Sequence, residues 1–481
     1  MQKTYFKLTI NYKKNTTNLK TQALIVGVAQ GKLNLLPIHI LDLIPESVKQ
    51  EFSGEAGQLK IVFVNSPLER IVLAGLGKKF NLEATRRILG KAISSLDKAV
   101  SKVGLYATGL EDYLEDLLVI SLISNYQYSH KKNKQVKELT EIVIVADKEP
   151  SQDVFKRSAA VANGVVIARD LANAPSNLMT PKSLAAAAKK VAKEIAGLSC
   201  KIKGLPELTK ENFGALLAVS QGSHQEPQLI EMSYKHPQAK RRIALVGKGV
   251  TFDSGGINIK PTPGMEEMKI DMAGGAVVVG VMAAIAQLDL PLEVIGIVPA
   301  TENMPSGAAI KPSDIVRSRS GLTVEVANTD AEGRMILADG LDYAKEFKPD
   351  EIIDLATLTG AALVAFGHER AALVGNNKKL NQLMIDAGER SGEGVWQLPL
   401  DNDYRTHVKS EIADVKNLGE GRNAGVIAGA AFLEKFIPKD TPWAHLDIAG
   451  PAIKSKPRSY ESRGGTGWGV RLLVEYLKSL N

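Results

Sequence analysis

Short apolar runs alternate with stretches of helical spacing along the first 165 residues. The short runs are rich in β-branched residues, which is typical of strands, whereas apolar residues at every third or fourth position predict helices. The expected strands are residues 23–28, 61–64, 71–76 and 141–146. The expected helices are residues 82–103, 111–124 and 153–172. Strands that alternate with helices in this way predict an α/β domain with a largely parallel sheet.

A turn-rich segment, NAPSNLMTP at residues 173–181, separates this region from the rest of the chain. Thr180 is suited to the N-cap and Pro181 to the first position of a new helix, which we expect over residues 182–195. We therefore predict an N-terminal domain of residues 1–165 and a C-terminal domain of residues 166–481.

The alternation continues beyond residue 200 with longer apolar runs, which predict more deeply buried strands. The expected strands are residues 242–246, 292–298, 351–356 and 443–448. The expected helices are residues 273–288, 335–347, 378–391, 424–436 and 469–480. The second domain is therefore also expected to be α/β, and it is the larger of the two.

Composition places the chain among soluble globular proteins. Of its 481 residues, 44% are hydrophobic and 23% are charged, which is enough apolar material for a large core. The longest purely apolar stretch, at 273–286, has 14 residues, fewer than the ~18 that a membrane span needs. The N-terminus lacks the apolar region of a secretory signal, and the single Cys200 excludes an internal disulfide. We expect a cytoplasmic protein without a membrane partner.

Charge is unevenly distributed, and this leaves a second class of function open. Residues 1–150 hold 21 Lys and Arg against 15 Asp and Glu, which accounts for most of the net charge of +7. A basic domain can attract nucleic acid, so an additional DNA-binding regulatory role is an alternative. No recognition motif supports it, and a solvated lysine surface explains the same excess. The lysine-rich run at 131–137 is interpreted as an exposed loop.

Two segments after expected strands of the second domain carry the candidate chemistry. The first, GKGVTFDSGGINIKP at residues 247–261, holds Lys248, Asp253 and Lys260, and Asp271 follows shortly after it. The second, NTDAEGRMILADGL at residues 328–341, holds Asp330, Glu332 and Arg334 at alternating positions. We expect this stretch to be extended, so that these three side chains face one site. Open α/β sheets place their sites at such strand ends.

Four carboxylates near one point require positive charge to offset their repulsion. Asp253, Asp271, Asp330 and Glu332 therefore predict divalent cations, and carboxylates that bridge can hold two of them ~3.5–4 Å apart. Oxygen ligands favour Mn²⁺ or Mg²⁺ and also allow Zn²⁺. A lysine can join such ligands only as the neutral amine. A di-metal phosphoesterase and a di-metal peptidase both remain compatible with this cluster.

The same residues resemble a known family. NTDAEGRMILADGL is similar to the signature of the leucyl (cytosol) aminopeptidases, the di-metal M17 family of peptidases, and GKGVTFDSGGINIKP and MKIDMAGGA resemble metal-binding segments of that family. LATLTGA at 355–361 and HLDIAGPA at 445–452 match the walls of its active site. The resemblance implies a smaller N-terminal α/β (macro-like) domain and a larger C-terminal α/β catalytic domain with a mixed central sheet. It also implies hydrolysis of N-terminal, Leu-like residues from peptides and a homohexamer built as a dimer of trimers.

The resemblance also implies a role for each matching residue. The implied metal ligands are Lys248, Asp253, Asp271, Asp330 and Glu332, which would hold two divalent ions, Mn²⁺ or Zn²⁺. Asp253 and Glu332 would bridge the two ions, and Lys260 and Arg334 would be catalytic without being ligands. A bicarbonate ion, proposed as the general base in this family, would bind at Ala331, Gly333, Arg334 and Leu358. The implied substrate pocket consists of Met268, Thr357, Thr359, Gly360 and Ala449.

Overall fold

The chain is described here from a computed structural model, in which it divides into two compact units. The described residues are 8–16, 19–65, 68–97, 99–130, 139–421 and 423–480. Unit 1 comprises the chain up to Asn163 together with Ser455–Arg463, and unit 2 comprises Gly164–Lys454 and the chain from Gly464 onward. The sequence predicted a single boundary after residue 165, whereas unit 1 also includes the later segment Ser455–Arg463.

Unit 1 is built on a six-stranded sheet in the order β1-β6-β5-β2-β4-β3. Every neighbouring pair is parallel except β3 with β4, which confirms the largely parallel sheet expected from the sequence. The strands are β1 (Thr9–Lys13), β2 (Ala23–Ala29), β3 (Leu59–Phe63), β4 (Arg70–Gly77), β5 (Lys102–Tyr106) and β6 (Glu141–Val145). The helices are α1 (Ile38–Leu41), α2 (Glu46–Glu51), α3 (Leu82–Ser95), α4 (Leu114–Ser124) and the first part of α5 (Gln152–Asn173).

The helix expected over residues 82–103 is wrong in its second part. Helix α3 ends at Ser95, and β5 follows as a strand between β2 and β6. Strand β5 packs closely against β2 at Gly104, where an added Cβ would lie 2.9 Å from Leu24 Cδ1. Pairing with strands on both sides therefore overrides the apolar spacing that suggested a longer helix.

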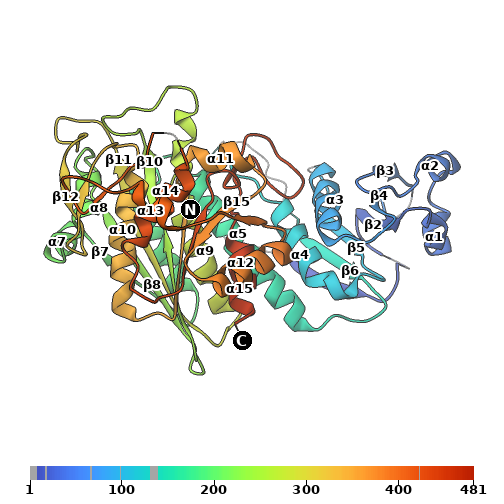
Figure 1. Cartoon of the computed structure of the whole chain (residues 1–481). Coiled ribbons are helices and arrows are strands. Elements are labelled where there is room, and N and C mark those ends of the chain that lie inside the picture. The colour runs from blue at the N-terminus through green and yellow to red at the C-terminus, as the bar shows by residue number, and fades with distance from the viewer. Residues whose placement is uncertain are drawn as a thin grey trace. The chain divides into compact units, whose positions relative to one another are not determined.

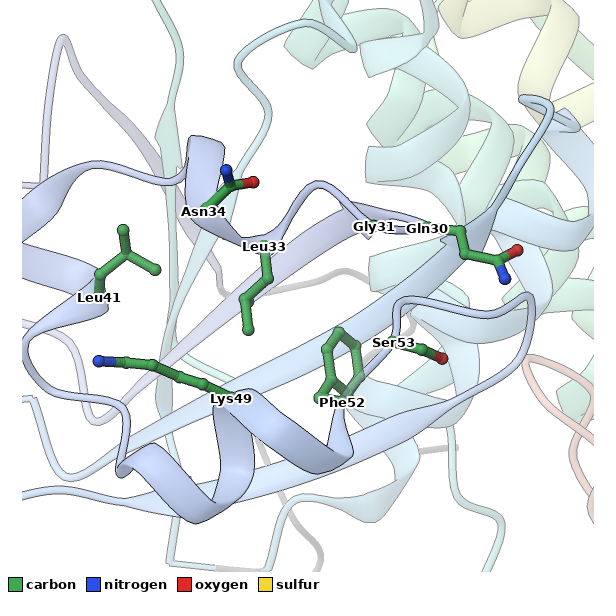
Figure 2. A pocket seen from close by; sticks show the side chains of 8 residues that line it. All are labelled: Gln30, Gly31, Leu33, Asn34, Leu41, Lys49, Phe52 and Ser53. Atoms are coloured by element: carbon green, nitrogen blue, oxygen red, sulfur yellow. The ribbon is translucent and has the colours of Figure 1, made fainter.

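Unit 1 also contains a hollow of about 530 Å³ beside the carboxyl end of β2 (Figure 2). Leu33, Leu41 and Phe52 contribute apolar surface to it, and Lys49 of α2 runs along one side. The lysine-rich run at 131–137, interpreted from the sequence as an exposed loop, lies outside the described residues.

Unit 2 contains a mixed nine-stranded sheet, as the resemblance implied. Its order is β16-β15-β18-β14-β9-β11-β8-β7, with β10 paired to β11. The central strands β18, β14, β9 and β11 are mutually parallel, whereas β15 and β8 are antiparallel to their inner neighbours. These strands are β7 (Leu198–Lys203), β8 (Gln228–Lys235), β9 (Arg242–Gly247), β10 (Gly249–Asp253), β11 (Glu293–Asn303), β14 (Glu351–Ala356), β15 (Ala371–Gly375), β16 (Val395–Gln397) and β18 (Trp443–Asp447).

Helices pack along this sheet, and their order can be followed by colour in Figure 1. Helix α6 (Pro181–Glu194) begins at the predicted cap, where the Thr180 side chain accepts from Ser183 N. The other helices of the predicted set are α9 (Ala273–Gln287), α10 (Glu332–Ala344), α12 (Lys378–Ser391), α14 (Gly425–Glu434) and α15 (Val470–Lys478). Shorter helices α7 (Leu205–Lys210), α8 (Gly214–Ser220), α11 (Gly360–Phe366) and α13 (Asn402–Thr406) join them. Small sheets pair β12 (Ile315–Arg317), β13 (Thr323–Glu325) and β17 (Val415–Lys416), and separately β19 (Ile453–Lys454) with β20 (Gly464–Gly465).

Helix α9 is a core helix despite its apolar composition. The helical stretch Met265–Gln287 is long and apolar enough to cross a membrane by composition, but 89% of its most apolar window is buried inside the fold. It packs on β9, β11 and β14, the central strands of the sheet. The apolar run at 273–286 is thus accounted for by the core of unit 2.

The first turn of α9 presses closely on the sheet, which leads to a prediction on stability. A Cβ on Gly274 would lie 2.2 Å from Leu355 O and 3.0 Å from Lys248 N, and both of these atoms belong to backbone. We expect Gly274→Ala to lower the free energy of unfolding by about 3 kcal/mol, because neither backbone can move away without breaking sheet hydrogen bonds. Gly307→Ala is the matched control, since no atom of the described residues lies within 4 Å of its added Cβ. Equal stability of the two variants in urea unfolding would contradict this packing.

Candidate active site

Three carboxylates of unit 2 meet beyond the carboxyl ends of the central strands. Asp253 is the last residue of β10, Asp330 lies two residues before Glu332, and Glu332 is the first residue of α10. One oxygen from each carboxylate can be chosen so that all three lie within 4.8 Å of one another. Asp253 and Glu332 are buried and Asp330 is partly exposed. The two sequence segments that were expected to share a site are therefore brought together.

The backbone that carries the second segment differs from the expectation. We expected an extended stretch in which Asp330, Glu332 and Arg334 face the same side, but α10 already begins at Glu332. In a helix, residues two apart point to different sides. Accordingly, Glu332 pairs with Lys248, whereas Arg334 Nη1 donates to Asn417 O at 2.9 Å. The extended interpretation was wrong because the helix starts three residues earlier than its apolar spacing indicates.

Lys248 connects the fourth carboxylate to this cluster. Its Nζ lies 2.8 Å from Asp271 and 2.9 Å from Glu332 Oε1, and it also donates to Thr357 O at 3.0 Å. Burial disfavours the charge on Lys248, but attraction to Asp271, Glu332 and Asp253 outweighs burial and raises the pKa of Lys248. The side chain is tightly enclosed, with an exposed fraction of 3%.

Lys260 holds the other side of the cluster. Its Nζ lies 2.8 Å from Asp253 Oδ2 and also forms an ion pair with Asp330. Burial opposes this charge too, but Asp253, Glu332 and Asp330 raise the pKa of Lys260. Its exposed fraction is 21%, so Lys260 is much more open than Lys248. The cluster thus has one enclosed and one accessible lysine.

The carboxylates themselves show how crowded the negative charge is. Burial, together with the Glu332 carboxylate, raises the pKa of Asp253 to about 6 against the opposing effect of Lys260. Burial also raises the pKa of Asp271 and Asp330, although lysines pull both the other way. For Glu332, burial is outweighed by Lys248 and Lys260, so its pKa is lowered.

This donor set fits divalent cations. All the converging acidic donors are carboxylate oxygens, the ligands that hard and borderline divalent ions accept. Glu332 Oε2 is buried and has no hydrogen-bond partner within the described part of the chain, so it has a free lone pair to offer. A cation at this point would satisfy that oxygen and offset the repulsion that raises the pKa of Asp253.

Arg334 provides a cationic group next to the cluster. Its guanidinium is buried, and burial lowers the pKa of Arg334 to about 10, partly opposed by Glu332 and Asp447. Within the described residues, its Nε lacks a hydrogen-bond partner. A Cβ added to Gly429 would meet Leu358 Cδ2 at 3.0 Å and Arg334 Nη2 at 3.5 Å, so these two side chains converge there. The guanidinium fork therefore keeps donors for a planar oxyanion.

The residues expected to form the substrate pocket lie on three segments of unit 2. Thr357 and Thr359 follow β14, Ala449 follows β18, and Met268 lies in a short 3-10 helix at Met265–Ile270. Gly360 is the first residue of α11. Thr357 Oγ1 donates to Asp271 Oδ1 at 2.8 Å, which ties the pocket residues to the carboxylate cluster.

Two asparagines that the sequence did not single out support the site. Asn303, at the end of β11, donates from Nδ2 to Asp253 Oδ1 at 2.8 Å and to Thr329 O at 3.0 Å. Asn417 accepts at Oδ1 from Ala327 N at 2.8 Å, and its backbone oxygen receives the Arg334 bond. Both are fully or almost fully buried. In the sequence the only available signal was an asparagine at the end of a strand or directly after one, and such asparagines are common in loops.

A mixed α/β sheet with a cation-compatible carboxylate cluster at its strand ends is an arrangement that metal-dependent hydrolases use. Residues 166–474 match the catalytic domain of the cytosol aminopeptidase family, and residues 43–135 match its N-terminal domain. The chain belongs to this family, which confirms the resemblance. The protein is therefore an aminopeptidase, a metal-dependent exopeptidase that acts on peptides.

Curated relatives and solved structures match this chain over nearly its whole length. A probable cytosol aminopeptidase of Geobacter sp. (strain M21) is 45% identical over 444 residues, covering 89% of this chain and 90% of the relative. The probable cytosol aminopeptidase of Syntrophotalea carbinolica is 43% identical over 486 residues, covering 96% and 97%. The bottromycin maturation enzyme BotP is 31% identical with a TM-score of 0.86, covering 96% and 99%, and its complex with Mn has a TM-score of 0.87.

Proposed function

We propose that the protein removes Leu-like N-terminal residues from peptides at a centre that binds two divalent ions. The observation that supports this most is the meeting of Asp253, Asp330 and Glu332 within 4.8 Å, with Asp271 joined to them through Lys248. Lys248, Asp253, Asp271 and Glu332 would hold one ion, and Asp253, Asp330 and Glu332 the other. When bound, such ions lower the pKa of water and polarise the peptide carbonyl. Manganese or zinc fits these donors.

The different exposure of the two lysines supports their different roles. Lys248 is enclosed by Asp271, Glu332 and Gly333, where a Cβ would lie 2.5 Å from Lys248 Cε. In the proposal this enclosed amine would become a ligand after it loses its proton. Lys260 is more open and keeps a charged ammonium beside Asp253. In the proposal it would donate to the oxygen of a scissile carbonyl as negative charge develops on that oxygen.

Arg334 is the second proposed catalytic residue. Its guanidinium, with the neighbouring Ala331, Gly333 and Leu358, would orient a bicarbonate ion as the general base, since neither of the two site segments, 247–261 and 328–341, contains a histidine. The free Nε donor supports this assignment. The role of Arg334 would be to hold this planar oxyanion in a fixed orientation.

The proposal also covers the substrate preference, the assembly and the location of the protein. Met268, Thr357, Thr359, Gly360 and Ala449 would form the wall that receives a Leu-like side chain. The proposed assembly is a homohexamer of two trimers, as the resemblance implies, and the proposed location is the cytoplasm, which is supported by the name cytosol aminopeptidase that the relatives carry. A DNA-binding role for the N-terminal domain stays a prediction from charge alone.

A substrate panel tests the proposed function. We expect purified protein loaded with Mn²⁺ to hydrolyse leucine p-nitroanilide, to be slower on alanine p-nitroanilide, and to leave p-nitrophenyl phosphate and N-acetyl-leucine p-nitroanilide intact. The acetylated substrate is the control for the free α-amine. Metal analysis should find two ions per chain, and chelation should abolish turnover. Hydrolysis of the phosphate ester, or of the acetylated substrate at the same rate, would overturn the proposal.

A further inference from the structure

Asp447 lies beside the proposed pocket without belonging to any role assigned above. It is the last residue of β18, and its side chain is fully buried. Strands β14 and β18 are parallel neighbours, with Ala356 opposite Asp447, so the segments that follow them leave the sheet side by side. These segments, residues 357–360 and 448–450, carry four of the five proposed pocket residues.

The Asp447 carboxylate bonds to both segments. Its Oδ1 accepts from Leu358 N at 3.1 Å and from Thr359 N at 3.4 Å on the first segment. The same oxygen accepts from Ala449 N at 3.2 Å on the second. Its Oδ2 accepts from Thr359 Oγ1 at 2.6 Å, the shortest of the four bonds. A single buried carboxylate therefore joins the two pocket walls.

These contacts also explain how a buried carboxylate is tolerated. Three backbone N–H groups and one hydroxyl replace the water that the carboxylate loses. The first segment is fixed at its other end too, because Thr357 Oγ1 donates to Asp271 in the carboxylate cluster. Without Asp447, the segment would keep its contact with Asp271 and lose its contact with the opposite wall.

We propose that Asp447 is a positioning residue that sets the spacing of the side-chain pocket and thereby the side-chain preference. This inference rests on the proposed function, since it takes residues 357–360 and Ala449 as the pocket walls. A pocket that discriminates between side chains by apolar contact needs its walls at a defined separation. Within the described residues, the Asp447 side chain bonds to Leu358, Thr359 and Ala449 and to none of the residues proposed to hold the ions, so its loss should change preference before it changes metal content.

The test compares kcat/KM for leucine and alanine p-nitroanilide in variants of the full chain. We expect Asp447→Ala to lower the leucine-to-alanine ratio by roughly tenfold, the discrimination that one or two methylenes provide in an apolar pocket. Asp447→Asn should stay close to the wild-type ratio, because its Oδ1 still accepts from the three N–H groups and its amide can donate to the Thr359 hydroxyl. Metal content per chain should be unchanged in both.

Asp354→Asn is the matched structural control. Asp354 is equally buried on β14 and bonds to Trp443 Nε1 and His445 Nδ1, but to neither pocket segment. It should lower thermal stability while leaving the substrate ratio as in wild type. If folded Asp447→Ala keeps the wild-type ratio, or if it loses metal and both activities together, the inference is wrong.

A second variant covers the case in which Asp447→Ala does not fold. Asp447→Ser leaves a hydroxyl in the buried site but removes both carboxylate oxygens that bond to the two segments. We expect the ratio to fall in Asp447→Ser and to hold in Asp447→Asn, and equal ratios would overturn the inference. Wild-type protein that cleaves no anilide would instead overturn the proposed function, and this is seen before any variant is measured.

Discussion

Asp253→Ala is expected to lose both divalent ions and to lower kcat/KM by on the order of 10⁴-fold, because the proposed bridging carboxylate serves both ions at once. The buried Asp253 pairs with Lys260 through Oδ2, and its Oδ1 accepts from Gly255 N and Asn303 Nδ2. Metal analysis after dialysis against micromolar chelator, together with turnover of leucine p-nitroanilide, measures the two effects.

Asp253→Asn separates the loss of a ligand charge from the loss of local structure. Its amide oxygen can still accept from Gly255 N and Asn303 Nδ2, so the end of β10 should keep its conformation. We expect this variant to unfold near the wild-type temperature and still to lose metal and activity. Two ions retained per chain in Asp253→Ala would contradict the bridging assignment.

The second large effect concerns the two lysines, whose required protonation states are opposite. Lys248 must be neutral to donate a lone pair, so Lys248→Arg should lose an ion, since guanidinium has none to offer. Lys260 must stay charged, so Lys260→Arg should keep both ions and part of the activity. Lys260→Ala should keep both ions and lower turnover by roughly 10²–10³, the usual effect of removing one donor to an oxyanion.

Metal stoichiometry and kcat measured together on these three variants decide the assignment. The enclosed position of Lys248 supports it, because a larger guanidinium cannot fit beside Gly333 without displacing the cluster. If Lys260→Ala loses an ion while Lys248→Arg keeps both, the two roles are reversed.

Local pattern predicted most of the secondary structure of this chain. Strands β2, β4, β9 and β14 lie within one residue of the expected ranges, because each is a short apolar run bounded by polar residues. The two errors have different causes. Strand β5 interrupts an expected helix because two neighbouring strands bind it, and α10 begins before its apolar positions do.

The amino-acid sequence was enough to predict the chemical types of the site residues and the family of the protein. Carboxylates and lysines in two segments after strands indicated a cation centre, and the sequences of those segments identified the aminopeptidase family. Such information is local, since it depends on a few residues close together in the chain.

Which of these groups meet, and which residues hold them in place, depends on the folding of the chain. Lys248 pairs with Glu332, 84 residues away in the sequence, and Asp447 bonds to Thr359, 88 residues away. Local sequence pattern does not predict contacts between residues so far apart in the chain. Asn303, Asn417 and Asp447 are ordinary polar residues in sequence. They gain their roles because folding buries them, and a buried polar group must bond to whatever the sheet brings beside it.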